Sequence, residues 1–85
     1  KWGYNYFMYY SYILKLSNNK YYAGFSADLK IRVLEHQNGG VDATKNFRPV
    51  KLVYYSAFNT KQKALDFEKY LKTQSGFAFR NKRFI

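Results

Sequence analysis

The sequence predicts a small α+β domain: a three-stranded antiparallel sheet flanked by helices, in the order β-β-α-β-α. Its 85 residues suffice for one compact domain, which we assign to residues 1–85. Two short stretches rich in Tyr flank a polar Ser-Asn-Asn tripeptide, which is typical of a β-hairpin. Two later segments carry apolar residues at helical spacing, and a stretch rich in Val and Tyr lies between them.

The length of the hairpin turn decides which tyrosines share a face of the sheet. A two-residue turn would send Tyr12 and Tyr22 to opposite faces, because strand side chains alternate. A three-residue turn at residues 17–19 instead sets Tyr12 opposite Gly24 and brings both tyrosines to one face. We predict the three-residue turn, or a bulge, because the site described below needs both hydroxyls together. The expected strands are residues 9–16 and 20–25.

Two helices and one more strand complete the predicted fold. Ser26 is the expected N-cap of the first helix, which should end where Asn38-Gly39-Gly40 begins. Thr60 is expected to cap the second helix. These helices are predicted at residues 27–37 and 61–73, with the third strand at 50–58 between them. Residues 77–85 are a candidate for a last short helix, and residues 1–7 for an N-terminal extension.

The composition favours a polyanionic partner. Fifteen Lys and Arg against five Asp and Glu give a formal charge of +10, and aromatic residues make up 22% of the chain. Cationic side chains release counterions from nucleic acids, and aromatic rings stack on bases. The chain has no cysteine, which excludes a disulfide partner, a thiolate metal site and a cysteine nucleophile. No apolar run approaches the roughly 18 residues of a membrane span, so we expect a cytoplasmic protein without a membrane partner.

The second predicted helix carries a carboxylate on its apolar side. At about 100° per residue, the apolar residues at positions 64, 65, 67 and 71 form one arc, and Glu68 lies within it. An unpaired carboxylate that faces a core is costly or takes up a proton. Glu68 therefore needs a cation, which is either a buried Lys or Arg or a metal ion. This residue alone leaves the two alternatives open.

Arg32 and His36 lie four residues apart on the first predicted helix and share a face. They flank the apolar pair Leu29 and Val33, so we expect them at the edge of the buried surface. A single arginine is more often structural or bound to phosphate than catalytic, and a single histidine is more often a satisfied polar side chain. Because His36 is the only histidine, a cluster of histidine metal ligands is excluded.

Taken together, these residues resemble the GIY-YIG nuclease family, and in particular its small stand-alone members, similar to excision-repair nucleases. Its two motifs correspond here to Tyr10-Ser11-Tyr12 and Tyr22-Ala23-Gly24, in which the motif Gly and both Ile residues are replaced. Arg32 follows Tyr22 by ten residues, which is the family's spacing for its catalytic arginine. Phe25 departs from the members that carry a lysine there. The resemblance extends over residues 8–84, including DLKIRVLEHQNG at 28–39, LVYY at 52–55, ALDFEK at 64–69 and the tail from 72 to 83.

The resemblance implies a metal-dependent DNA endonuclease that hydrolyses phosphodiester bonds with low sequence specificity. Arg32 would stabilise charge on the phosphate, one of the two tyrosines would orient or deprotonate the attacking water, and His36 would hydrogen-bond that water or a tyrosine hydroxyl. Glu68 would hold one Mg²⁺ or Mn²⁺ ion, because such ions keep several waters and take phosphate oxygens as ligands. The implied catalytic residues are therefore Tyr12, Tyr22, Arg32, His36 and Glu68.

DNA backbone contacts are expected from the basic side chains outside this set. Contacts of this kind position DNA without reading its bases. A non-catalytic nucleic-acid-binding module on the same fold is the alternative, and RNA is a less expected substrate because nothing in the sequence reads a 2′-hydroxyl. The expected DNA-binding residues are Lys15, Lys30, Lys45, Arg48, Lys69, Lys72, Arg80, Lys82 and Arg83.

Overall fold

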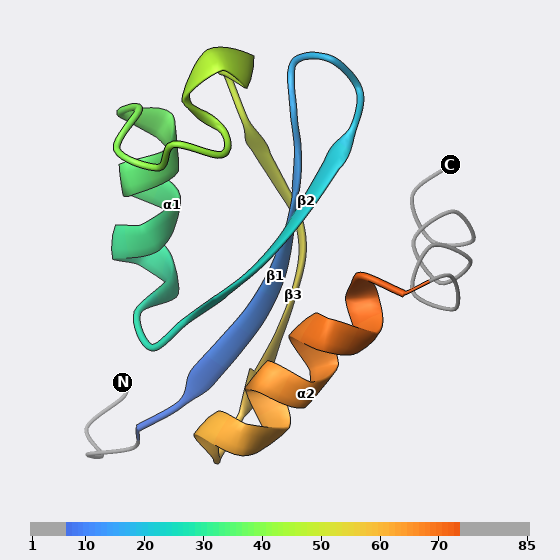
Figure 1. The fold of residues 1–85 in the computed structure, drawn as a ribbon. Helices are drawn as coiled ribbons and strands as arrows, with labels where there is room; N and C mark the ends of the chain where they lie inside the picture. The colour runs from blue at the N-terminus through green and yellow to red at the C-terminus, as the bar shows by residue number, and fades with distance from the viewer. Residues whose placement is uncertain (1–6, 74–85) are drawn as a thin grey trace.

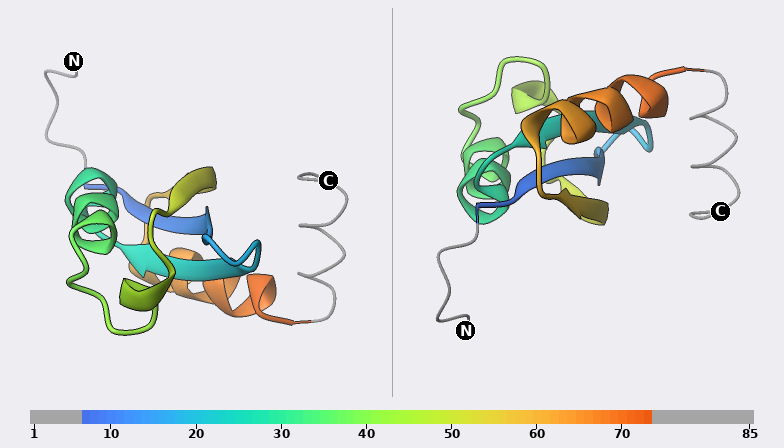
Figure 2. Two further views of the ribbon diagram at one scale, coloured as in Figure 1. Left: turned by 90° about the horizontal axis from the view of Figure 1, so that it is seen from above. Right: turned by 90° about the horizontal axis from the view of Figure 1, so that it is seen from below.

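The computed structural model describes residues 7–73 and contains a three-stranded antiparallel sheet with a helix on each side (Figures 1 and 2). The strand order is β2-β1-β3, so β1 is central. This confirms the predicted α+β class and the order β-β-α-β-α. The elements are β1 (Tyr9–Lys15), β2 (Tyr21–Ser26), α1 (Leu29–Gln37), the short 3-10 helix η1 (Lys45–Phe47), β3 (Lys51–Phe58) and α2 (Lys61–Leu71).

Two sequence predictions fall partly or wholly outside the described residues. These are the last short helix at residues 77–85 and the first six residues of the candidate N-terminal extension. Within the described residues, neither helix is long and apolar enough to cross a membrane.

The hairpin has the predicted register. Tyr12 pairs with Gly24, and Leu14 pairs with Tyr22. The backbone N–H of Leu16 donates to the carbonyl of Lys20 at 2.8 Å, which leaves residues 17–19 as the turn. Asn19 adopts a φ of 66°, a left-handed conformation that asparagine tolerates better than most residues. The odd turn length therefore brings Tyr12 and Tyr22 to the same face of the sheet.

Alternation along β1 divides the core into two layers. Tyr12 and Leu14 pack on the α1 side with Leu16 and Val50, and Tyr22 and Leu29 cover this layer. On the α2 side, Ile13 packs with Ala23 and Leu71, and Phe67 of α2 is among the residues that cover this second layer. The central strand is thus buried on both faces, and its side chains determine what each helix contacts.

The start of α1 corrects one sequence prediction. Asp28, and not Ser26, is the N-cap: its Oδ1 accepts a hydrogen bond from the Ile31 N–H at 3.1 Å. The Ser26 hydroxyl instead accepts from the Asp28 N–H at 2.9 Å and donates to the Asp28 carbonyl at 2.8 Å. Ser26 therefore braces the turn into the helix, and α1 begins two residues later than predicted, at Leu29. Thr60 caps α2 as predicted, through the Lys63 N–H at 3.2 Å.

The loop from α1 to β3 is fastened to the end of α1 by side chains. Arg48 donates to the carbonyls of Lys45 at 2.9 Å and Gln37 at 3.3 Å. The Gln37 amide donates to the Val50 carbonyl at 2.6 Å and accepts from the Val50 N–H at 3.2 Å. The loop therefore has a defined position over α1 although it contains little regular structure.

Gly24 permits the close approach of Tyr12 to β2, which yields the first prediction. A Cβ at this position would overlap Cζ and the hydroxyl oxygen of Tyr12. Gly24→Ala should lower the free energy of unfolding by about 1–3 kcal/mol, because a packed core resists added atoms. Urea unfolding of the two proteins measures this difference.

Gly40→Ala is the matched control. The nearest atom to a Cβ at Gly40 is the Glu35 carbonyl oxygen at 3.4 Å, an ordinary contact. This variant should stay within about 0.5 kcal/mol of the wild type. Equal stability of Gly24→Ala and Gly40→Ala would show that the Tyr12 ring is not held against β2.

Candidate active site

The centre of the site is a hydrogen bond between two fully buried side chains. The Tyr12 hydroxyl and Nε2 of His36 lie 2.8 Å apart, and neither residue has exposed surface. The His36 ring also meets the rings of Tyr12 and Tyr22 edge-on, with centroid distances of 5.7 and 5.3 Å. His36 of α1 therefore joins the two tyrosines that β1 and β2 bring to one face.

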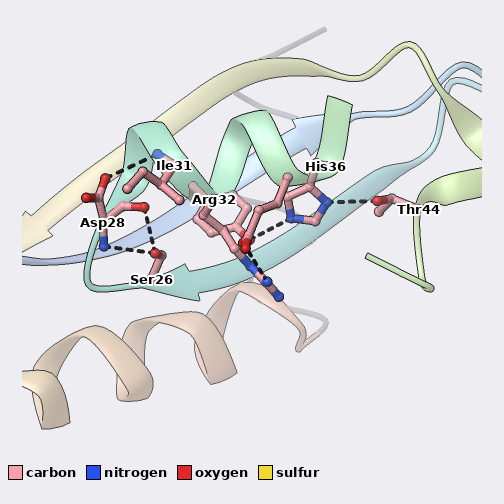
Figure 3. A network of polar contacts seen from close by, with 8 residues as sticks. Ser26, Asp28, Ile31, Arg32, His36 and Thr44 are labelled. Carbon is pink, nitrogen blue, oxygen red and sulfur yellow. Dashed lines mark hydrogen bonds and ion pairs between the residues drawn. The ribbon is translucent and has the colours of Figure 1, made fainter. Parts of the chain in front are cut away.

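His36 is held on its other side by the loop after α1. Its Nδ1 lies 2.8 Å from Oγ1 of Thr44, which is also fully buried (Figure 3). The expectation that His36 lies at the edge of the buried surface is wrong, because the loop folds over it. Sequence reasoning missed Thr44: it lies in an irregular segment, and no spacing or motif distinguishes it from the neighbouring polar residues.

Arg32 lies one helical turn before His36, at the edge of the buried surface as predicted. Its side chain keeps 36% of its exposure, and Nη1 pairs with Oε1 of Glu35 at 3.1 Å. The guanidinium also acts on the phenol of Tyr12, whose pKa it lowers. Because a guanidinium carries five N–H donors, these two partners leave donors available at the surface.

The buried pair has a defined protonation state at neutral pH. Burial raises the pKa of Tyr12 to about 12, against the lowering effect of the Arg32 hydrogen bond, while Tyr22 and Glu68 also raise it. Burial lowers the pKa of His36, and the positive charge of Arg32 lowers it further, against a raising effect of Glu35. Near pH 7 Tyr12 is therefore a neutral phenol and His36 a neutral imidazole.

Glu68 reaches the site from α2. Its side chain keeps 19% of its exposure, and its charge acts on the Tyr12 phenol. Oε2 accepts a hydrogen bond from Nζ of Lys72 at 3.2 Å, and this lysine is 55% exposed. The sequence left a buried Lys or Arg and a metal ion as alternative partners of Glu68. Among the described residues the partner is Lys72, which lies at the surface and not in the core.

Glu68 fits a divalent ion of the Mg²⁺ type. Within residues 7–73, no three His, Cys, Asp or Glu side chains gather in one place, so these residues build no full protein cage. Mg²⁺ and Mn²⁺ do not need one, because they keep waters and bind through one or two carboxylates plus phosphate oxygens. The Lys72 ammonium can turn into solvent and free the carboxylate, since an exposed ion pair of this kind is weak.

The expected DNA-binding residues are spread over several elements. Lys45 pairs with Asp42 at 3.5 Å, and Arg48 fastens the loop to α1, so two of these cations also have structural contacts. Arg80, Lys82 and Arg83 lie outside the described residues. The other expected cations are exposed or half-buried on β1, α1 and α2 and at the C-cap of α2: Lys15, Lys30, Lys69 and Lys72.

A groove on the described part of the chain is lined by residues other than those of this site. It has a volume of about 650 Å³ and is lined by apolar residues that include Tyr10, Leu29, Val33 and Tyr55. None of the five predicted catalytic residues lines it. Of the cluster around Tyr12, Arg32 and Glu68 are partly exposed, whereas Tyr12 and His36 are fully buried.

The chain belongs to the GIY-YIG family, because the family model described as the GIY-YIG catalytic domain matches residues 8–83. The family predicted from the motifs is thus confirmed.

The chain is also similar to several UPF0213 proteins. A UPF0213 protein of Staphylococcus saprophyticus is 43% identical over 67 residues, which are 78% of this chain and 82% of that protein. The UPF0213 protein YazA of Bacillus subtilis is 42% identical over 62 residues, which are 72% of this chain and 63% of YazA. The solution structure of the UPF0213 protein BH0048 from Bacillus halodurans matches with a TM-score of 0.56 and 27% identity, covering 88% of this chain and 83% of that one.

The buried neutral His36 predicts an acid-sensitive fold. Its folded pKa lies below the 6.5 of an unfolded histidine, so the unfolded chain gains a proton before the folded one does. Stability is therefore full above pH 6.5 and falls as the pH drops below it, with a limiting slope of about 1.4 kcal/mol per pH unit. Urea unfolding between pH 8 and pH 5 measures this, and no other histidine contributes. A free energy of unfolding that stays level from pH 8 to pH 5 contradicts the burial of a neutral imidazole.

Proposed function

We propose that the protein is a metal-dependent DNA endonuclease that hydrolyses phosphodiester bonds with low sequence specificity. The convergence of Tyr12, Tyr22, Arg32 and His36 in one contact cluster, next to the carboxylate of Glu68, is the observation that supports this most. Two strands and two helices contribute these side chains. Membership in a family of catalytic domains supports the same class of reaction.

Arg32 is suited to bind the scissile phosphate. Its guanidinium lies at the edge of the cluster, bound to the Tyr12 phenol on one side and to Glu35 on another. Further N–H donors can take phosphate oxygens and stabilise the charge that develops as water adds to phosphorus. The 3.1 Å ion pair with Glu35 limits the freedom of the Arg32 guanidinium.

The tyrosines are suited to handle the proton of the attacking water. In hydrolysis, water adds to phosphorus, the bond from phosphorus to the leaving oxygen breaks, and the water loses a proton. Tyr12 is protonated at neutral pH, with a pKa of about 12, so it serves as a base only when its oxygen can hold negative charge. The positive charge of Arg32, which lowers the pKa of Tyr12, supports that charge.

Glu68 is the proposed ligand of a single Mg²⁺ or Mn²⁺ ion. When bound there, such an ion would supply positive charge to phosphate oxygens and lower the pKa of a bound water. Glu68 lies on α2, and both its charge and that of Arg32 act on the Tyr12 phenol. Because both side chains are partly exposed, a phosphate bound by Arg32 would have the Glu68 carboxylate nearby.

The basic charge supports DNA as the substrate. The formal charge of +10 means that basic side chains outnumber acidic ones, so many of them can contact the DNA backbone. Such contacts neutralise phosphates and carry no sequence information. Low sequence specificity follows from this kind of contact. Binding should therefore weaken steeply as salt is added.

Two substitutions test the proposed reaction. Glu68→Gln and Arg32→Ala should each lower the rate of Mg²⁺- or Mn²⁺-dependent DNA nicking by at least about 10²-fold, because each removes charge from the reacting centre. The measurement is relaxation of supercoiled plasmid together with cleavage of branched, nicked, single-stranded and double-stranded DNA. Asp66→Asn is the matched control, since Asp66 is an exposed acid on the same helix that accepts a hydrogen bond from Gln62 at 2.8 Å.

The control separates catalysis from a change in net charge. Asp66→Asn should cut at the wild-type rate, and all three variants should unfold cooperatively. If the wild type binds DNA in a salt-dependent way but cuts none of these forms with either metal, the non-catalytic binding module on the same fold takes the place of the endonuclease.

A further inference from the structure

We propose that Lys15 of β1 and Lys51 of β3, which we call the lysine pair, form a contact surface for the phosphate backbone of DNA, and that their mutual repulsion lowers the stability of the free protein. The inference deepens the proposed function and rests on DNA as the ligand, but not on cleavage. Lys15 is among the expected DNA-binding residues, whereas Lys51 is not, and only the register of the sheet brings the two together.

The sheet register sets the two lysines directly opposite each other. Lys15 is the Cα partner of Lys51 in the antiparallel pairing of β1 with β3. Side chains of direct partners point to the same face, with Cβ atoms about 4.5–5.5 Å apart. Lys51 is exposed and Lys15 is half-buried. Two like charges at directly opposite positions destabilise a sheet.

A β-bulge produces this pairing. An unbroken register between β1 and β3 would set Leu52 opposite Lys15. The register instead shifts between Ile13 and Leu14, which sets Lys51 there. Bulges re-aim side chains and are frequent beside functional sites. The same shift brings Leu52 to the apolar layer on the α1 side, so the bulge serves packing and also sets the two positive charges side by side.

No carboxylate among residues 7–73 neutralises the lysine pair. The whole chain has five acidic residues, and all of them lie between positions 28 and 68. Three form ion pairs with other cations, one caps α1 and one accepts a hydrogen bond from Gln62. In that order they are Glu35, Asp42, Glu68, Asp28 and Asp66. The described part of the chain thus leaves both lysines available to an anion from solution.

The lysine pair lies on the α2 side of the sheet, near the end of α2. Ile13 packs with Leu71 in the layer on this side, and Lys15 follows Ile13 by two residues on the same face, about 7 Å along the strand. Figure 2 shows α2 running along this face towards the hairpin turn. Lys72 is the C-cap of α2 and pairs with Glu68. A phosphate chain that leaves Glu68 towards the hairpin turn therefore meets Lys72 and then the lysine pair.

A phosphate group held between two ammonium groups replaces their repulsion by attraction. Each phosphate that is neutralised releases counterions from DNA and adds about 0.9 to the slope of log affinity against log salt. In the free protein the repulsion remains and lowers stability. The lysine pair should therefore act in opposite directions on folding and on DNA binding, which a packing role would not do.

DNA binding without cleavage tests the contact. The probe is a fluorescein-labelled DNA duplex, whose anisotropy is followed in EDTA between about 50 and 200 mM NaCl. Lys51→Gln should weaken binding about three- to tenfold near 0.1 M salt and reduce the salt slope by about 1. Lys63→Gln is the matched control, since Lys63 is an exposed lysine in the first turn of α2, at the other end of that helix. This control should keep the wild-type slope.

Thermal unfolding without DNA tests the repulsion. Lys51→Glu sets an opposite charge beside Lys15 and should raise Tm by about 1–5 °C. In a Lys15→Gln background the same substitution should leave Tm nearly unchanged, because the partner charge is gone. The increase should also shrink at about 1 M salt, which screens the two charges from each other.

The outcomes separate the proposal from its alternatives. A Lys51→Gln protein with the wild-type salt slope, or a Lys63→Gln protein with an equal loss, overturns the phosphate contact. A Tm of Lys51→Glu that does not rise, or that rises equally in the Lys15→Gln background, overturns the repulsion. If Lys51→Gln weakens binding to phosphatidylglycerol vesicles but not to DNA, a membrane surface replaces DNA as the ligand and the proposal fails.

Failure of the proposed function is distinguishable from failure of this contact. A wild type that binds the duplex through Lys51, but cuts no DNA form with Mg²⁺ or Mn²⁺, removes the endonuclease and supports the lysine pair as the contact of a binding module. A wild type that cuts DNA while the Lys51→Gln variant binds with unchanged affinity and slope keeps the endonuclease and overturns the contact.

Discussion

The hydrogen bond between Tyr12 and His36 is the interaction on which the arrangement of the site depends. It joins the central strand to α1 inside the protein, where neither group exchanges its partner for water. Burial keeps both groups neutral near pH 7. A neutral phenol and a neutral imidazole can each donate or accept a hydrogen bond, so either group can be the donor in this pair. Thr44 contacts this pair from the buried loop, and the charge of Arg32 acts on it from the partly exposed edge.

The backbone of β2 makes this hydrogen bond possible. Gly24 lies opposite Tyr12, and any side chain there would occupy the space of the phenol. The three-residue turn sets this pairing, since a turn one residue shorter would move Tyr22 to the other face. The length of the turn thus determines which polar side chains of the two strands lie on the same face.

Much of this arrangement follows from the sequence, for reasons that can be stated residue by residue. Period-two alternation left two hairpin registers open, and the expected site, which needs both tyrosine hydroxyls on one face, selected the register that the structure has. Helical spacing predicted the shared face of Arg32 and His36 and the partly buried position of Glu68. The complete burial of His36 could not be predicted from the sequence. Helical spacing indicates the direction in which a side chain points, whereas the burial of His36 depends on the loop that folds over it. Thr44 was missed for the same reason: its contact joins positions brought together by tertiary structure alone. The N-cap at Asp28 was misassigned because Ser26 competes for the same local role.

The way α1 is attached has a consequence for the order in which the domain comes apart. Of the nine residues in α1, His36 is the buried one, while Ile31 and Leu34 are largely exposed. The apolar layer on the α2 side contains no residue of α1, whereas Leu29 of α1 packs against the other layer. Local unfolding that starts at α1 would therefore break the hydrogen bonds of His36 and uncover one layer while the second layer stays closed.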